Sequence, residues 1–250
     1  MSECWVALGG NLGDVEQTFH SALDRIGAHP GVRVRCLSSI HRTVPVGNQA
    51  GGDFRNAAAG LETELAPLDL LDLLQDCETA LGRVRLGHWG PRTLDLDLLL
   101  YGDAVLDVPR LRVPHPHFWF RRFVLDPLVE IAADVVHPVK GRSIRELQSR
   151  LLVRPLICAL SGRTDEIRRE CRAELAPEFP EVELIEWNAW AVPLEPALIA
   201  WLGPEAGVCD SAATFSALPS VPRLDVAALA SETDTPSATL RHVLHAALGR

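Results

Sequence analysis

The stretch WGPRTLDLDLLLYGD, from Trp89 to Asp103, most restricts the folds open to this chain. It is rich in leucine, as a buried strand is, yet Asp95 and Asp97 stand two residues apart within it. Aspartate is depleted in strands, because its short polar side chain competes for the backbone. Side chains at i and i+2 share one face of a strand, so both carboxylates project together while the alternating leucines face the other way. The sequence therefore predicts a buried strand that presents a carboxylate pair.

Apolar periodicity on either side of this strand predicts alternating strands and helices. Strands are predicted over residues 4–10, 32–43 and 56–65, and helices after an N-cap at Asp14 and a first-turn proline at Pro67. In chain order the pattern is β-α-β-β-α-β, which predicts an α+β fold: a ferredoxin-like α/β sandwich with added helices.

Further elements are predicted along the rest of the chain. A hairpin-like segment over 104–116 precedes a helical segment over 117–134 that Pro127 is expected to interrupt, and Ser143 with Glu146 forms a capping box. The later patterns are a helix over 164–175, a strand over 181–187 and a final amphipathic helix over 237–248.

Charge separates the chain into two regions. The net charge is −9, with 17 basic and 19 acidic side chains in residues 1–158 against 7 and 14 in residues 159–250. We predict one domain over 1–158 and an acidic C-terminal extension of mixed structure and unknown function over 159–250. Its segment 207–237, rich in Ala, Ser, Thr, Pro and Asp, is predicted to be flexible. The negative charge argues against a nucleic-acid surface.

The sequence carries no targeting or disulfide signal. No apolar run approaches the roughly 20 residues of a membrane helix, and the N-terminus lacks the basic region of a signal peptide. The six cysteines form no CxxC pair, so they are expected to be reduced thiols. We therefore expect a cytoplasmic protein that does not bind a membrane.

The residues beside the carboxylate pair predict phosphoryl chemistry. Arg92 lies three residues before Asp95, and Arg83 and Arg85 lie on a glycine-punctuated loop upstream. Two carboxylates on a rigid strand can hold Mg²⁺, and arginines can neutralise phosphate charge. No P-loop is present, and Lys140 is the only lysine, so a phosphate grip must use arginine. A solvated strand face beside a charged loop is the alternative interpretation.

The motif GHWGPRTLDLDLLLYGD resembles the signature of the 6-hydroxymethyl-7,8-dihydropterin pyrophosphokinases of folate biosynthesis. The resemblance extends in order through ALGGNLGD, SSIHRTVPVG, DFRNAAAGLET, LGRVR, RLRVPHP and RFVLDPLVEIA, roughly residues 3–155. It implies transfer of the terminal diphosphate of ATP to the hydroxymethyl oxygen of the pterin, with release of AMP, on a ferredoxin-like fold.

The resemblance also implies roles for individual residues. Asp95 and Asp97 would bind two Mg²⁺ ions, and Asp97 would act either as the base for the hydroxyl or only as a metal ligand. Arg83 and Arg92 would stabilise the transferred diphosphate. The ATP site would contain Gln75, Glu78, Arg85, Arg110, His115 and Arg121. The pterin pocket would contain Thr43, Val46, Phe54, Asn56, Trp89 and Phe123, with Phe123 and either Phe54 or Trp89 stacking on the flat ring.

The chain departs from the family pattern at a few positions. The first turn reads GGN in place of GSN, the loop from Gly82 to Trp89 is one residue short and lacks lysine, Val44 replaces a frequent proline, and Pro116 occupies an adenine-side position. The shorter loop puts the arginine geometry in question.

Two further points stay open on the sequence alone. The alternatives to a pyrophosphokinase are a non-catalytic sensor of a pterin or nucleotide, and another transferase with a D-x-D metal site. In the extension, Trp187, Trp190 and Trp201 would form a small core if buried, or a surface for a protein partner or self-association if exposed.

Overall fold

The computed structural model describes residues 1–44, 52–83, 92–187, 196–204, 215, 218, 222–230 and 234–249. The chain forms two compact units, the first made of Met1–Gln148 and Ala246–Arg250 and the second of Ser149–His245. The boundary predicted after residue 158 falls inside a strand of the second unit, β10 (Leu156–Ser161). This strand begins before the change in composition that set the predicted boundary.

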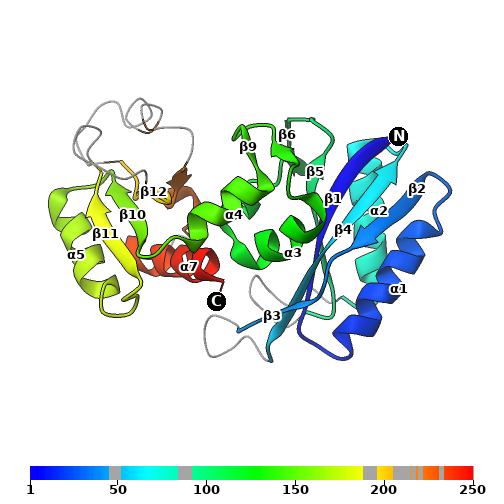
Figure 1. The fold of residues 1–250 in the computed structure, drawn as a ribbon, viewed down its shortest axis with the longest axis horizontal. Helices are drawn as coiled ribbons and strands as arrows, with labels where there is room; N and C mark the ends of the chain where they lie inside the picture. Colours follow the sequence, from blue (N-terminus) through cyan, green and yellow to red (C-terminus); the bar gives the residue numbers. More distant parts are fainter. Residues whose placement is uncertain are drawn as a thin grey trace. The chain divides into compact units, whose positions relative to one another are not determined.

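A five-stranded antiparallel sheet forms the centre of the first unit (Figure 1). Its strands are β1 (Ser2–Gly10), β2 (Val32–Leu37), β3 (His41–Thr43), β4 (Phe54–Thr63) and β5 (Asp95–Tyr101). The order is β2-β4-β1-β5, with β3 paired to β4, so β5 is an edge strand. Helix α1 (Val15–Gly27) follows β1 and α2 (Pro67–Ala80) follows β4. Without β3 this is the predicted β-α-β-β-α-β order, and the α+β fold class is confirmed.

Helices α1 and α2 cover one face of this sheet (Figure 1). Phe19 of α1 and Leu70 and Leu74 of α2 are fully buried in one cluster with Leu96 and Leu98 of β5. Burial of such side chains contributes roughly 1.5–3 kcal/mol each, so this cluster fixes β5 in the sheet.

The helix caps follow the sequence. The Asp14 carboxylate accepts a hydrogen bond from the Gln17 amide at 3.1 Å, and Pro67 begins α2. The Gln17 side chain reaches Ser21 and not the cap, so only half of a capping box forms.

The first unit also contains two short hairpins and further helices. They are the hairpin β6 (Leu106–Val108) and β7 (Leu111–Val113), η1 (Phe118–Phe120), α3 (Arg122–Ala132), the hairpin β8 (Val136–His137) and β9 (Arg142–Ser143), and the start of α4 (Ile144–Leu152). Helix α3 contacts β4 and β3. The predicted capping box is confirmed, because Ser143 and Glu146 exchange hydrogen bonds in both directions.

The predicted interruption at Pro127 is wrong. Pro127 lies inside α3, and the helical segment is divided instead at Arg121, between η1 and α3. Pro127 cannot donate a hydrogen bond to the Phe123 carbonyl, yet α3 continues through it to Ala132.

The second unit contains a four-stranded parallel sheet, ordered β11-β10-β12-β13. Besides β10 its elements are α5 (Asp165–Leu175), β11 (Val182–Glu186), β12 (Leu198–Trp201), β13 (Arg223–Asp225), η2 (Ala227–Leu229) and most of α7 (Pro236–Leu248). The three elements predicted here, α5, β11 and α7, are confirmed. The segment predicted to be flexible, residues 207–237, contains β13 and η2 among its described residues, and its flexibility stays a prediction.

The tryptophans of the second unit favour a small core over an exposed surface. Trp201 is buried in a cluster with Ile199 and Leu218, and Trp187 packs against the same cluster. Trp190 lies outside the described residues. In the described part of the chain, no helix is both long and apolar enough to cross a membrane.

Candidate active site

Strand β5 places Asp95 and Asp97 on the face of the sheet opposite α1 and α2. Leu96 and Leu98, which alternate with them, are 5% and 4% exposed in the core under the helices. The alternation predicted from the sequence therefore holds, and both carboxylates project from a strand that its leucines hold in place.

Small residues on the neighbouring strand β1 leave room beside the two carboxylates. Asp95 pairs across the sheet with Gly9 and Asp97 with Ala7, and Gly9 pairs on its other side with Asn56 of β4. A Cβ atom at Gly9 would lie 3.6 Å from Asn56 Oδ1 and 3.8 Å from the Asp95 Cβ. The glycine thus keeps the space between the carboxylate and the amide clear.

Two arginines bind Asp95 from different segments. Arg83 Nη2 lies 2.6 Å from Asp95 Oδ1, and Arg92 Nη1 lies 2.5 Å from Asp95 Oδ2. The backbone at Arg92 is fixed by Asn11. The side-chain oxygen of Asn11 accepts from the Arg92 backbone amide at 2.8 Å, and the backbone amide of Asn11 donates to the Arg92 carbonyl at 2.9 Å. The two guanidinium groups therefore meet at one carboxylate.

Asp97 lies in a less favourable electrostatic environment than an exposed aspartate. Burial and, after it, the charge of Asp95 raise the pKa of Asp97 to about 6, against the opposing charge of Arg121. Burial also lowers the pKa of Arg121, which the two aspartates partly offset. A carboxylate pair of this kind attracts further positive charge, as a metal-binding site does.

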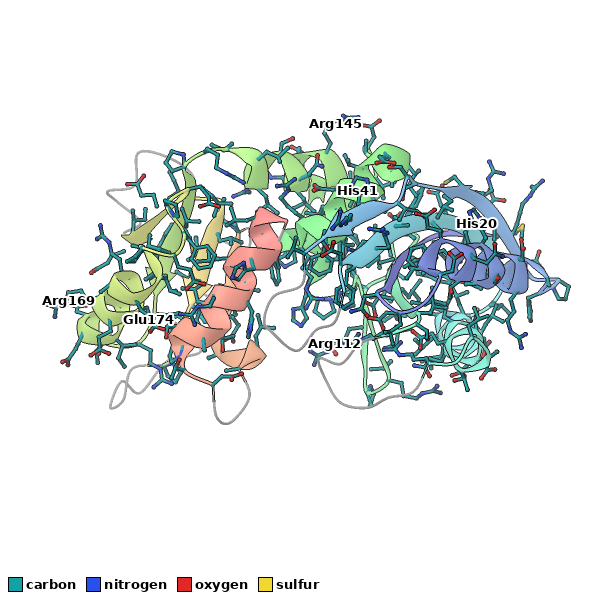
Figure 2. All side chains as sticks on the ribbon, turned by 90° about the horizontal axis from the view of Figure 1, so that it is seen from below. His20, His41, Arg112, Arg145, Arg169 and Glu174 are labelled. Atoms are coloured by element: carbon teal, nitrogen blue, oxygen red, sulfur yellow. The ribbon has the colours of Figure 1, made fainter. Side chains whose placement is uncertain are left out.

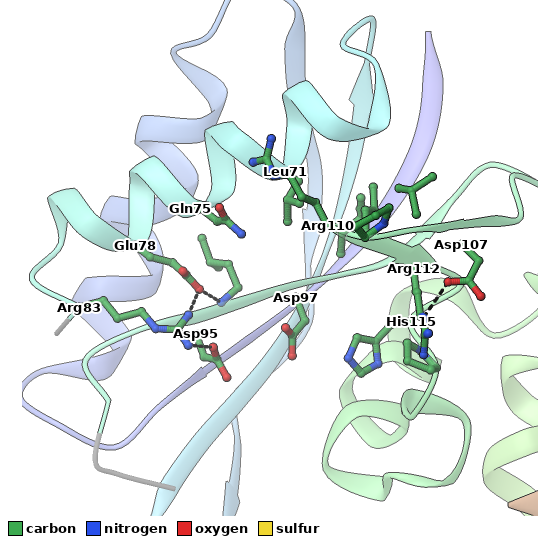
Figure 3. Close-up of a pocket in the computed structure, with 16 residues that line it drawn as sticks. Leu71, Gln75, Glu78, Arg83, Asp95, Asp97, Asp107, Arg110, Arg112 and His115 are labelled. Atoms are coloured by element: carbon green, nitrogen blue, oxygen red, sulfur yellow. Dashed lines mark hydrogen bonds and ion pairs between the residues drawn. The ribbon is translucent and has the colours of Figure 1, made fainter. Parts of the chain in front are cut away.

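Glu78 joins α2 to the carboxylate strand. The residue is 3% exposed, and Oε1 accepts a hydrogen bond from the Leu96 amide at 2.7 Å while also pairing with Arg83 (Figure 3). Burial raises the pKa of Glu78, against the hydrogen bond from Leu96 and the charge of Arg83. Because Leu96 stands between the two aspartates, Glu78 holds both the strand and the arginine.

A cavity of about 730 Å³ opens along β5, lined by residues of α2 and of the β6–β7 hairpin (Figure 3). Seven residues predicted for the site line it: Gln75, Glu78, Arg83, Asp95, Asp97, Arg110 and His115. Pro116, which the resemblance puts at an adenine-side position, also lines the cavity. The lining further includes residues that the sequence reasoning missed: Leu71, Leu96, Leu98, Asp107, Val108, Pro109, Leu111 and Arg112. The missed residues of the β6–β7 hairpin surround Arg110, whose place in the predicted hairpin was the only signal for them.

His115 enters this cavity as a neutral imidazole. Burial, with the charges of Arg121 and His117, lowers the pKa of His115 to about 3. The His117 amide donates to Nδ1 of His115 at 3.3 Å, so Nδ1 carries no proton and Nε2–H is the donor. Arg110 pairs with Asp72 at the outer part of α2.

The residues predicted to bind the pterin come from three elements. Asn56 on β4 is 7% exposed, and its amide donates to the Thr43 hydroxyl at 2.9 Å. Thr43 on β3 pairs with Phe54 on β4, so these three residues form one group. Phe123 stands in the first turn of α3, with the Arg121 guanidinium 5.9 Å from its ring centroid.

Three predicted site residues cannot be placed. Val46, Arg85 and Trp89 lie outside the described residues. Asn11 was missed as a site residue, although GGN was noted as a turn, because its role depends on a contact 81 residues away with Arg92.

A ferredoxin-like sheet with paired carboxylates, three converging arginines and a cavity beside them places the protein among the enzymes that transfer phosphoryl groups. Comparison with known families narrows this class. A profile described as 7,8-dihydro-6-hydroxymethylpterin-pyrophosphokinase (HPPK) matches residues 5–133, which all lie in the first unit. The chain belongs to the HPPK family, and the protein is a pyrophosphokinase of folate biosynthesis.

Curated relatives agree with this family. A 2-amino-4-hydroxy-6-hydroxymethyldihydropteridine pyrophosphokinase from Pseudomonas aeruginosa is 48% identical over 143 residues, which are 57% of this chain and 88% of that protein. One from Haemophilus influenzae is 46% identical over 138 residues, 55% of this chain and 86% of that protein. Among solved structures, Plasmodium falciparum HPPK-DHPS with pteroate has a TM-score of 0.49 at 12% identity, covering 80% of this chain and 56% of that one.

Proposed function

We propose that the protein transfers the terminal diphosphate of ATP to the hydroxymethyl oxygen of 6-hydroxymethyl-7,8-dihydropterin, and that the cavity along β5 is the site of this reaction. The main support is that Asp95, Asp97 and Arg83 line this cavity together, while Arg92 pairs with Asp95 and the charge of Arg121 acts on Asp97. Phosphoryl transfer depends on such preorganised charge, because negative charge spreads over the phosphate oxygens as the bond breaks.

In this proposal the cavity between α2 and the β6–β7 hairpin takes the nucleotide. Gln75, Arg110 and the Nε2–H group of His115 supply hydrogen bonds, since all three line the cavity. Arg83 and Arg92 turn from Asp95 to phosphate oxygens when ATP enters, while Glu78 keeps its contact with the strand. The predicted phosphate ligands Arg85 and Arg121 complete the set.

The two carboxylates fit Mg²⁺ at this position. Among the described residues no group of three or more His, Cys, Asp or Glu could hold a metal ion, so the ligands that we propose from this part of the chain are the pair Asp95 and Asp97. Mg²⁺ at nucleotide sites takes one or two carboxylates, with phosphate oxygens and waters as its other ligands. Two bound ions would neutralise phosphate charge and make the hydroxyl more acidic.

The dihydropterin is proposed to occupy the face that carries Asn56 and Thr43. Asn56 can offer both a donor and an acceptor to the amide-like edge of the ring, and Phe123 offers an aromatic face. Phe54, and Val46 and Trp89 in the segments that are not described, would complete the pocket.

The proposed reaction is a single displacement at the β-phosphorus of ATP. The hydroxymethyl oxygen attacks the β-phosphorus of ATP and forms the new P–O bond, while the bond between that phosphorus and the α–β bridging oxygen breaks. AMP leaves with the electron pair. The hydroxyl proton goes to Asp97, or to solvent if Asp97 acts only as a metal ligand.

The direct test is to incubate the purified chain with Mg-ATP and the dihydropterin and to identify the nucleotide product. We expect AMP, formed only when the pterin is present. Formation of ADP or pyrophosphate would indicate a different transferase, and tight pterin binding without turnover would indicate a sensor. Either result would overturn the proposal.

We propose that the second unit is a separate domain, and that the reaction in the first unit does not require it. The family profile ends before it begins. A protein partner or self-association through this unit, and a cytoplasmic location, remain predictions from the sequence.

A further inference from the structure

A carboxylate on α3 binds the segment that leads into β3, away from the cavity. Glu130 Oε1 accepts from the Ser39 hydroxyl at 2.7 Å and lies 2.6 Å from His41 Nε2. Its other oxygen, Oε2, accepts from the Ser39 backbone amide at 2.8 Å. Figure 2 labels His41 on the strand that runs beside this helix. One side chain therefore gathers three contacts across 89 to 91 residues of sequence.

This group of Glu130, Ser39 and His41 does not have the geometry of a nucleophilic triad. The Ser39 hydroxyl lies 3.2 Å from His41 Nε2, the same nitrogen that contacts the carboxylate. A serine nucleophile needs the serine and the carboxylate on opposite ring nitrogens. The geometry points to a structural connection between α3 and β3.

Both elements joined by this group carry residues of the proposed pterin pocket. On β3, His41 pairs with Asn56 and Thr43 pairs with Phe54, so the position of β3 fixes the Thr43–Asn56 hydrogen bond. On α3, Phe123 stands seven residues before Glu130, about two helical turns away on the same side. The separation of α3 from β3 thus sets the distance between Phe123, which would stack on the pterin ring, and the Thr43–Asn56 pair, which would bind its edge.

We propose that Glu130 is a positioning residue for the pterin, which fastens β3 to α3 and so sets the width of the pterin pocket. This inference rests on the proposed function, because that function places the pterin between Phe123 and Asn56. Glu130 does not touch the reacting atoms, and its effect is expected on pterin affinity more than on the chemical step.

The electrostatics of Glu130 agree with this role. Partial burial acts to raise the pKa of Glu130, but the hydrogen bonds from Ser39 and His41 outweigh it and hold the pKa below its ordinary value. The Glu130 and His41 side chains are 35% and 31% exposed, and such partly solvated pairs contribute little to the stability of the whole fold. Loss of the contact should therefore leave the unit folded and change its local geometry.

The test compares Glu130→Ala with a matched control, Glu146→Ala. Glu146 also accepts from a serine amide, at 2.8 Å, and from the same serine's hydroxyl, at 3.0 Å, but it does so at the start of α4. We expect Glu130→Ala to raise the KM and the Kd for the pterin on the order of tenfold, with the KM for ATP unchanged. Glu146→Ala should leave all three constants unchanged.

Two further variants separate positioning from simple damage. Glu130→Gln keeps an oxygen for the Ser39 amide and should restore most of the pterin affinity. His41→Phe removes one of the contacts of Glu130. In the double variant with Glu130→Ala and His41→Phe, the increase in pterin Kd should be smaller than the product of the two single increases, because both changes remove the same connection. Fully multiplicative effects would overturn the proposal.

The outcomes distinguish this inference from the proposed function. Absence of AMP release by the unaltered chain would overturn the function, while the pterin Kd, measured by titration, still tests Glu130. If Glu130→Ala leaves the pterin Kd within about twofold of the unaltered value, or raises the ATP and pterin constants equally, Glu130 does not position the pterin. If the unaltered chain does not bind the pterin, both proposals fail.

Discussion

Asp97 stands two residues from Asp95 on β5, in a position that burial and the neighbouring charge make unfavourable for an ionised carboxylate. We expect Asp97→Asn to lower kcat about 10³-fold, because the proposed metal and the hydroxyl both lose a charged partner. The thermal midpoint of the metal-free protein should not fall, since asparagine is not repelled by Asp95. AMP release and thermal unfolding measure the two effects. Asp103→Asn, at an exposed turn after β5, is the control, and an Asp97→Asn variant within tenfold of the unaltered kcat would contradict the assignment.

The same residue predicts a pH dependence of stability. A carboxyl with a raised pKa binds its proton more tightly in the folded chain, so between its ordinary pKa of 3.8 and about 6 the folded state is the more protonated one. The contribution of Asp97 to the free energy of unfolding therefore falls as pH rises through this window and is constant above it. Urea unfolding of metal-free protein should show this decline, and Asp97→Asn should lack it. Parallel curves for the two proteins would show that Asp97 does not titrate there.

At the scale of elements, the sequence predicted what depends on local pattern. The alternation of leucine and aspartate gave the orientation of Asp95 and Asp97, and Ser143 with Glu146 gave a helix start. The contact of Glu78 with the Leu96 amide could not be predicted in this way, because it depends on β5 being an edge strand that α2 crosses. The family resemblance implies an ATP-site role for Glu78, which stays a prediction, and the structure adds the buried contacts of Glu78 with the strand and with Arg83.

The end of β1 gives a prediction at the same scale. A Cβ atom at Gly10 would lie 2.7 Å from the Thr93 carbonyl oxygen and 3.1 Å from a Val15 methyl group. Gly10→Ala must displace the Thr93 backbone, which lies between Arg92 and Asp95. We expect a loss of about 1–3 kcal/mol in the free energy of unfolding, together with a lower kcat. Denaturant unfolding and AMP release test both.

Gly27→Ala is the matched control for this variant, because the added methyl would meet only a Val34 methyl at 3.4 Å. If Gly10→Ala and Gly27→Ala behave alike in both measurements, the contact with Thr93 does not hold the arginine in place.

At the scale of the whole molecule, the second unit was the hardest to predict. Its strands β10 and β12 are buried along almost their whole length and lie between parallel neighbours, so they read as short apolar runs without alternation. Such runs do not distinguish a strand from a buried helix segment. Only β11, whose residues alternate, gave a strand pattern.

The two units have separate sheets and separate core clusters, which predicts how the chain responds to its substrates. Mg²⁺ with a non-hydrolysable ATP analogue at about 100 times its Kd should stabilise the unit that binds it by about 2.7 kcal/mol. Amide hydrogen exchange should therefore slow in β5 and α2 and stay unchanged in β10 and β12. Equal protection of all four elements would show that ligand binding in the first unit is coupled to the second unit. The second unit would then take part in the response of the enzyme to its substrates.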